Sequence, residues 1–88
     1  MELDEAYQII KMPYVTEKTF GLIEKQNKMV FMVSDNATKS QIKRAIELMY
    51  DVKVAHVNTL RSVSGKKAYV TFTSDSPASE LASRLGVL

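Results

Sequence analysis

The chain has 88 residues, 45% of them hydrophobic and 25% charged, which is the composition of a single soluble globular domain spanning 1–88. This balance excludes disorder and collagen-like repeats, and the lack of cysteine excludes disulfides, thiol nucleophiles and thiolate zinc sites. The net charge of +2 is too small to indicate a nucleic-acid partner by itself.

The first third of the chain predicts a strand and a helix. The apolar run Gln8–Met12 is interpreted as the first strand. Thr16 is the expected N-cap of a helix over about 17–26, whose Phe20 and Ile23 are predicted to face inward.

A second strand and a second helix follow. Lys28–Ser34 predicts a strand, and because its centre is apolar on both faces we expect cover on both sides of the sheet. Thr38 and Gln41 have the spacing of a capping box for a helix over Lys39–Tyr50. The apolar stripe of this helix consists of Ile42, Ala45, Ile46 and Met49.

A hairpin is predicted from Val54–Val63 and Lys66–Ser74, joined by the two-residue loop Ser64-Gly65. This register pairs Val63 with Lys66 and gives the hairpin two different faces. The core face carries Val57, Thr59 and Arg61 opposite Phe72, Val70 and Ala68. The other face carries His56, Asn58, Leu60 and Ser62 opposite Thr73, Thr71, Tyr69 and Lys67.

A last helix is expected to begin with Pro77 at its first position and to end at Gly86. Its apolar stripe consists of Ala78, Leu81, Ala82 and Leu85. The resulting order is β-α-β-α-β-β-α. We therefore predict an α+β fold in which a four-stranded, mainly antiparallel sheet is packed with helices.

The charge is unevenly distributed along the chain. From Asn36 to Ser74 there are seven basic and two acidic residues, or +5, whereas the remainder, with five basic and eight acidic residues, carries −3. On the hairpin, lysines could neutralise phosphates, Asn58 and Thr71 could form hydrogen bonds, and Tyr69 could stack on an unpaired base. A solvated sheet face with a cross-strand Leu60–Tyr69 pair remains the alternative.

The sequence offers little for catalysis. His56 is the only histidine, so a histidine dyad or a histidine metal cluster is excluded, and the three glycines are too far apart for a phosphate loop. We expect no enzyme, no cofactor, no metal and no small-molecule substrate.

We also expect a cytoplasmic protein without membrane insertion, because the N-terminus is acidic and Met29–Val33, the longest apolar run, is short.

Five short motifs occur in order across nearly the whole chain. They are PYVTEK at 13–18, ATKSQIK at 37–43, VKV at 52–54, VNTL at 57–60 and KKAYV at 66–70. Together they resemble the signatures P-H/Y-V-T/S-E-K, A-T/S-K-x-x-I-K, V-x-V-x-x-V-N-T and K-K-A-Y-V of the ribosomal protein L-twenty-three family of the large subunit.

The resemblance implies a ribosome-bound protein that binds large-subunit ribosomal RNA beside the polypeptide exit tunnel, next to other large-subunit proteins. It also implies a docking surface for the signal recognition particle and the protein-conducting channel, and in bacteria for trigger factor. The docking residues implied are Glu17 and Lys18. Bacterial members carry a long basic loop between the last two strands; the short loop here is similar to archaeal members, so lining of the tunnel is not implied.

The expected RNA contacts are Lys39, Lys43, Asn58, Thr59, Arg61, Lys66, Lys67 and Tyr69. Thr59 is included through the V-N-T motif, because the predicted register turns it towards the core. Two other functions stay open. A protein-interaction adaptor without RNA would bind its partner even after ribonuclease treatment. A free-standing single-stranded RNA-binding domain would lose about 1–3 kcal/mol of binding on Tyr69→Ala.

Overall fold

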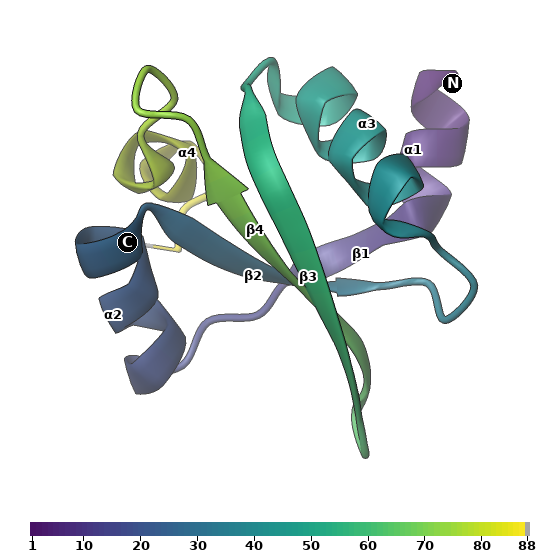
Figure 1. Cartoon of the computed structure of the whole chain (residues 1–88), viewed down its shortest axis with the longest axis horizontal. Helices are drawn as coiled ribbons and strands as arrows, with labels where there is room; N and C mark the ends of the chain where they lie inside the picture. The colour runs from purple at the N-terminus through teal and green to yellow at the C-terminus, as the bar shows by residue number, and fades with distance from the viewer. Residues whose placement is uncertain (88) are drawn as a thin grey trace.

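In the computed structural model, residues 1–87 are described, and they form four helices and one four-stranded sheet (Figure 1). The elements are α1 (Leu3–Ile9), β1 (Ile10–Pro13), α2 (Glu17–Gln26), β2 (Lys28–Val33), α3 (Lys39–Tyr50), β3 (Val54–Ser62), β4 (Gly65–Phe72) and α4 (Ala78–Arg84). The strand order is β1-β2-β4-β3, and every neighbouring pair is antiparallel. The α+β class and the four-stranded antiparallel sheet are therefore confirmed.

The helix α1 was not predicted, and the first strand is shorter than expected. Gln8 and Ile9 belong to α1, and β1 begins only at Ile10. Ala6 and Ile9 are buried, and α1 packs on α3, so this short helix is stabilised by a neighbour that is distant in sequence. The prediction of a strand at this position missed that packing.

The N-caps of α2 and α3 are confirmed. Thr16 Oγ1 accepts from the Thr19 amide at 3.2 Å, and Thr38 Oγ1 accepts from the Gln41 amide at 3.2 Å. The prediction that Phe20 faces inward was wrong, since 37% of its surface is exposed. The inward positions of α2 are instead Thr19 and Ile23, four residues apart on the same side of the helix.

The hairpin turns one residue earlier than predicted. Ser62 pairs with Gly65, so the turn is Val63-Ser64, and Gly65 is the first residue of β4. Gly65 has a φ of 124°, which only glycine adopts readily, whereas Val63 and Ser64 keep negative φ. Partners on the two strands are thus shifted by two residues relative to the prediction.

A shift of two residues leaves each side chain on its predicted face. The partners change, however. Asn58 lies opposite Tyr69 instead of Thr71, and Leu60 lies opposite Lys67 instead of Tyr69. The alternative Leu60–Tyr69 cross-strand pair is therefore not formed as a directly opposite pair.

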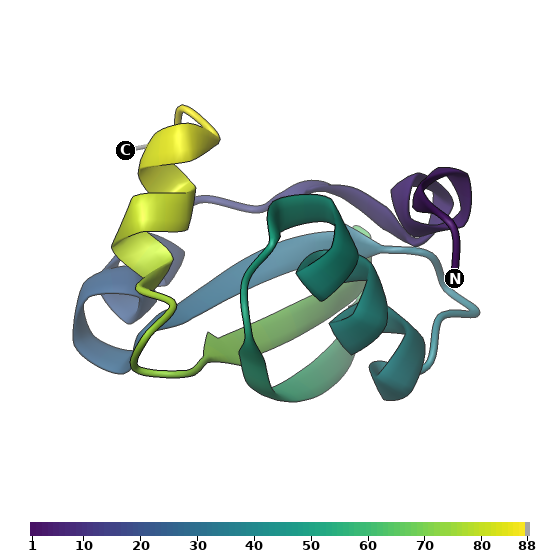
Figure 2. The same ribbon diagram turned by 90° about the horizontal axis from the view of Figure 1, so that it is seen from above.

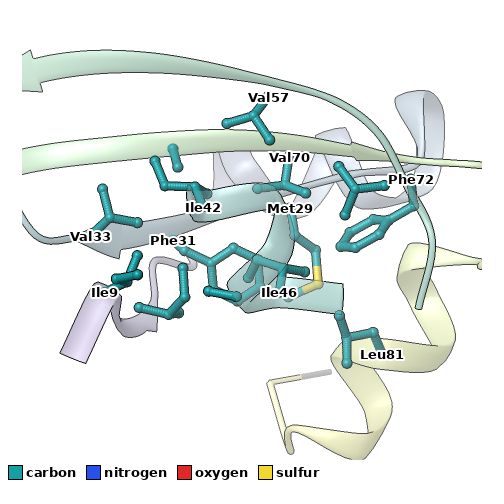
Figure 3. Close-up of a cluster of buried hydrophobic side chains, with 14 of the residues drawn as sticks. Ile9, Met29, Phe31, Val33, Ile42, Ile46, Val57, Val70, Phe72 and Leu81 are labelled. Atoms are coloured by element: carbon teal, nitrogen blue, oxygen red, sulfur yellow. The ribbon is translucent and has the colours of Figure 1, made fainter. Parts of the chain in front are cut away.

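The hydrophobic core lies on one face of the sheet, beneath α1, α3 and α4 (Figure 2). Met29, Phe31 and Val33 of β2 point into it, and Figure 3 shows Ile46 of α3 and Leu81 of α4 beside them. α2 stands at the end of β2 and contacts α4.

The expected cover on both sides of the sheet is not provided by helices. Val30, on the face opposite the core, is only 2% exposed, but Met12 and Leu60 on that face are 59% and 53% exposed. We call this surface the open face. It is lined by Met12, Tyr14, Lys28, Val30, Met32, His56, Asn58, Leu60, Ser62, Lys67, Tyr69 and Thr71.

Helix α4 begins one residue later than predicted, because Pro77 is its N-cap and Ala78 its first helical residue. Its end is as expected. Gly86 has a φ of 74°, and the amides of Gly86 and Val87 donate to Ser83 and Ala82, which is a Schellman motif. Among residues 1–87, no helix is long and apolar enough to cross a membrane.

Candidate nucleic-acid interface

The structure separates the expected RNA contacts into two groups on opposite sides of the β3–β4 hairpin. Successive residues of a strand point to opposite faces, so neighbours such as Lys66 and Lys67 are directed away from each other. The helix-side group contains Lys39, Lys43, Thr59, Arg61 and Lys66, and the open-face group contains Asn58, Lys67 and Tyr69.

In the helix-side group, Arg61 and Lys66 connect the hairpin to the segment before α3 through hydrogen bonds. They are directly opposite each other in the sheet. The Arg61 guanidinium donates to the Asp35 carbonyl at 3.1 Å, and Lys66 Nζ donates to the Ala37 carbonyl at 2.7 Å. Each cation keeps further N–H donors, so both can also contact a phosphate.

The other members of this group differ in accessibility. Lys39 and Lys43 are exposed on the first turns of α3. Thr59 is half-buried opposite Ala68, which is completely buried, so the predicted core-facing orientation of Thr59 is confirmed. The lysines are therefore the more accessible phosphate contacts.

A row of side chains crosses the open face from one edge of the sheet to the other. Tyr14 follows β1, and its amide donates to the Val30 carbonyl at 2.8 Å. Val30 is opposite Tyr69, and Tyr69 is opposite Asn58. Val30 thus lies between two tyrosines, and both tyrosines are half-buried.

Lys67 lies in the neighbouring row and reaches over Tyr14. Its Nζ atom is 4.0 Å from the centroid of the Tyr14 ring, a cation–π contact. Tyr14 was not predicted as a site residue, although it is part of the PYVTEK motif. The alternation of β4 could place Lys67 on the open face, but only the pairing of β1, β2 and β4 brings Tyr14 next to it.

His56 is also on the open face, with Nε2 3.4 Å from the hydroxyl of Thr71. It is exposed, so its ring is accessible to solvent and to a phosphate. Among residues 1–87, no group of histidine, aspartate and glutamate could hold a metal ion.

Comparison with known proteins identifies the family. The model of the family described as Ribosomal protein L23 matches residues 8–78, a span that includes all five motifs and both groups of expected RNA contacts. The chain belongs to this family. The match also includes Tyr14 and the whole sheet, but it leaves out most of α1 and of α4.

Relatives in this family match over nearly the full chain. Two proteins named "Large ribosomal subunit protein uL23", from Methanococcus aeolicus and Methanococcus maripaludis, are 43% and 45% identical to it. Each match covers 94% of this chain and 98% of the relative. A protein of the same name from Tetrahymena thermophila is 43% identical over 93% of this chain but only 55% of its own length.

The residues that the family resemblance implies in docking lie at the start of α2. Glu17 is the first residue of that helix and Lys18 the second, and both are exposed. A carboxylate at this position is also favoured by the helix dipole, so Glu17 has a structural reason to be acidic. Val15 and Phe20, 38% and 37% exposed, provide apolar surface on either side of the pair in sequence.

Proposed function

We propose that this chain is a structural constituent of the large ribosomal subunit that binds large-subunit ribosomal RNA near the polypeptide exit tunnel. The observation that carries the proposal is the family match over residues 8–78, together with a large-subunit relative that matches 94% of the chain. No catalytic step is proposed, and we expect the protein to be ribosome-bound in the cytoplasm, beside other large-subunit proteins.

The two groups of contacts suggest how RNA is held. β3 is an edge strand, and Figure 1 shows the β3–β4 turn projecting beyond the helices. RNA that touches both groups must pass around this hairpin, since the groups are on opposite sides of it. Lys39, Lys43 and the free donors of Arg61 and Lys66 would neutralise phosphates and set affinity without base selectivity.

Docking of nascent-chain factors is the second part of the proposal. The signal recognition particle and the protein-conducting channel are the expected factors, and the start of α2 is the proposed contact. Support comes from the exposed charges of Glu17 and Lys18 and the exposed apolar side chains of Val15 and Phe20. Charged and apolar groups exposed side by side are suited to binding a protein surface.

The first experiment is sedimentation of the native protein from lysate through a high-salt sucrose gradient, with and without ribonuclease. Migration with the large subunit that is abolished by ribonuclease is the expected result. Migration as a small free species would contradict the ribosomal role. Binding to a partner that survives ribonuclease would favour the protein-interaction adaptor instead.

The phosphate contacts are tested with the double variant Lys39→Ala, Lys43→Ala. The slope of log affinity against log salt for purified large-subunit RNA should fall by about one for each true phosphate contact. Lys25→Ala, an exposed lysine on α2, is the matched control and should leave the slope unchanged. An unaltered slope in the double variant would remove both lysines from the interface.

The docking contact is tested with ribosomes that carry Glu17→Gln. Co-sedimentation of purified signal recognition particle with these ribosomes should be weaker than with the wild type, because one exposed charge is removed without a change of shape. Glu24→Gln, on the same helix and also exposed, serves as the control. Equal binding to both variants would show that Glu17 does not contact this factor.

A further inference from the structure

The backbone of Tyr14 is fixed from two directions. Its amide donates to the Val30 carbonyl at 2.8 Å, and its own carbonyl accepts from the Thr19 hydroxyl at 3.1 Å. Thr19 is only 6% exposed and is part of the N-cap of α2. The backbone from which the Tyr14 ring extends is therefore held at a defined place at the edge of the open face.

This ring in turn holds Lys67. A lysine side chain on a sheet surface has many rotamers, and fixing it costs conformational entropy. In this structure the ammonium lies over the Tyr14 ring at 4.0 Å, so the positive charge is positioned before any ligand binds. Lys67 uses its charge in no other contact that the structure describes in residues 1–87, and its N–H donors can still reach an anion.

Tyr69 is the other half-buried ring on the open face, two residues beyond Lys67 on β4. Val30 supports it on one side, and on the other lies Asn58, whose exposed amide can both donate and accept hydrogen bonds. The arrangement offers an aromatic surface, a cation and an amide within neighbouring rows of one sheet. These are the three groups that bind an unpaired nucleotide by stacking, phosphate contact and base-edge hydrogen bonding.

The charge of the sheet favours a nucleic acid as the occupant. None of the four described strands contains an aspartate or a glutamate, whereas Lys28, Lys67 and His56 all lie on the open face. A polyanion therefore meets only cations, polar groups and apolar groups on these strands. The exposed Met12 and Leu60 would suit a protein partner, and cross-linking of intact large subunits distinguishes such a partner from RNA.

We propose that the open face holds a subsite for one unpaired nucleotide of ribosomal RNA, with the base stacked on Tyr69 and the phosphate at Lys67. Tyr14 is the positioning residue that holds Lys67, and Asn58 contacts the base edge. This inference rests on the proposed binding of ribosomal RNA and makes it more specific. RNA on this face would be bound through a base as well as through its phosphate backbone.

The stacking is tested by filter binding of the purified chain to large-subunit RNA from the same cells. Tyr69→Leu is expected to lower the affinity about 5- to 160-fold, the usual range for one stacked base, whereas Tyr69→Phe keeps the ring and stays close to wild type. Tyr7→Leu, an exposed tyrosine on α1, is the matched control. Equal affinities for the Leu and Phe variants at position 69 would refute the stacking.

The role of Tyr14 is tested through the salt dependence, which a merely structural residue would not alter. Lys67→Met keeps the apolar stem and should reduce the salt slope by about one. Tyr14→Leu should reduce the slope in the same direction, Tyr14→Phe should not, and the double variant Tyr14→Leu, Lys67→Met should be no worse than Lys67→Met. Additive losses would show that Tyr14 does not act through Lys67.

Ultraviolet cross-linking of intact large subunits, followed by mass spectrometry, tests the subsite without any variant. A nucleotide adduct on the peptide that contains Tyr69 is the expected result. Adducts only on peptides from α3 would refute the subsite and leave the proposed function intact, since RNA binding would persist there. A protein cross-link at Tyr69 would assign the open face to a protein neighbour. Failure of the chain to bind the RNA at all would refute the proposed function itself.

Discussion

Asn27 connects three elements through one side chain, and its replacement should be strongly destabilising. Its Nδ2 atom donates to the carbonyls of Phe72 and Thr73 at 3.1 and 3.0 Å, and its Oδ1 atom accepts from the Ala78 amide at 2.6 Å. These contacts join the end of α2 to the end of β4 and the start of α4. Asn27 also has a φ of 53°, the left-handed conformation that ends α2.

The magnitude follows from these contacts. Each hydrogen bond contributes about 0.5–1.5 kcal/mol net, so Asn27→Gly, which keeps the left-handed backbone without strain, should lose about 2–4 kcal/mol. Asn27→Ala should lose about 1 kcal/mol more, because a Cβ without a compensating hydrogen bond disfavours positive φ. A domain of this size has a total stability of about 4–13 kcal/mol, so the effect is a large part of it.

The assay is urea unfolding of the isolated chain, followed by far-ultraviolet circular dichroism. The expected order of the free energy of unfolding is wild type, then Asn27→Gly, then Asn27→Ala. If the alanine variant does not fold, the glycine variant still gives a value. A free energy for Asn27→Gly within about 0.5 kcal/mol of wild type would show that the Asn27 side chain does not stabilise the fold, because surface substitutions without such contacts fall in that range.

Three further predictions concern stability and use the same assay. Thr38→Ala removes the N-cap of α3 and should cost about 1 kcal/mol, whereas Thr38→Ser should cost far less; equal losses would contradict the capping role. The Glu47 carboxylate accepts a hydrogen bond from the buried Val54 amide at 2.9 Å, so Glu47→Ala should cost about 1–3 kcal/mol of stability. Glu47→Gln keeps an acceptor and should lose less. A loss in Glu47→Gln as large as in Glu47→Ala would argue against this hydrogen bond. Burial, and secondarily Tyr7, raises the pKa of Tyr50 above 10.0. The unfolded chain therefore releases this proton first, and the free energy of unfolding should fall as the pH rises through 10.0 and above, less steeply in Tyr50→Phe than in wild type. Identical slopes would show that Tyr50 does not contribute.

Much of the candidate site could be predicted because a strand alternates strictly between two faces. An error of two residues in the hairpin register left Asn58, Lys67 and Tyr69 on the predicted face. The same error assigned the wrong cross-strand neighbours. The prediction placed Tyr69 opposite Leu60, whereas the structure pairs it with Asn58, and this difference changes the chemistry available beside the ring.

Several elements were predicted correctly because their signals are local. The capping box of α3, the cap of α2 and the glycine that ends α4 are all read within a few residues, because each depends on hydrogen bonds along a single turn. The five motifs determined the family in the same way, as short patterns in order. None of these inferences needed the position of any other element.

Other features depend on contacts between distant parts of the chain and could be seen only in the folded protein. α1 is a helix because Ala6 and Ile9 pack on α3, and the hairpin register depends on the backbone of Gly65. The contact between Lys67 and Tyr14 exists because β2 lies between β1 and β4 in the sheet. A local sequence pattern does not specify such neighbours, because packing between elements depends on the whole fold and not on any one segment.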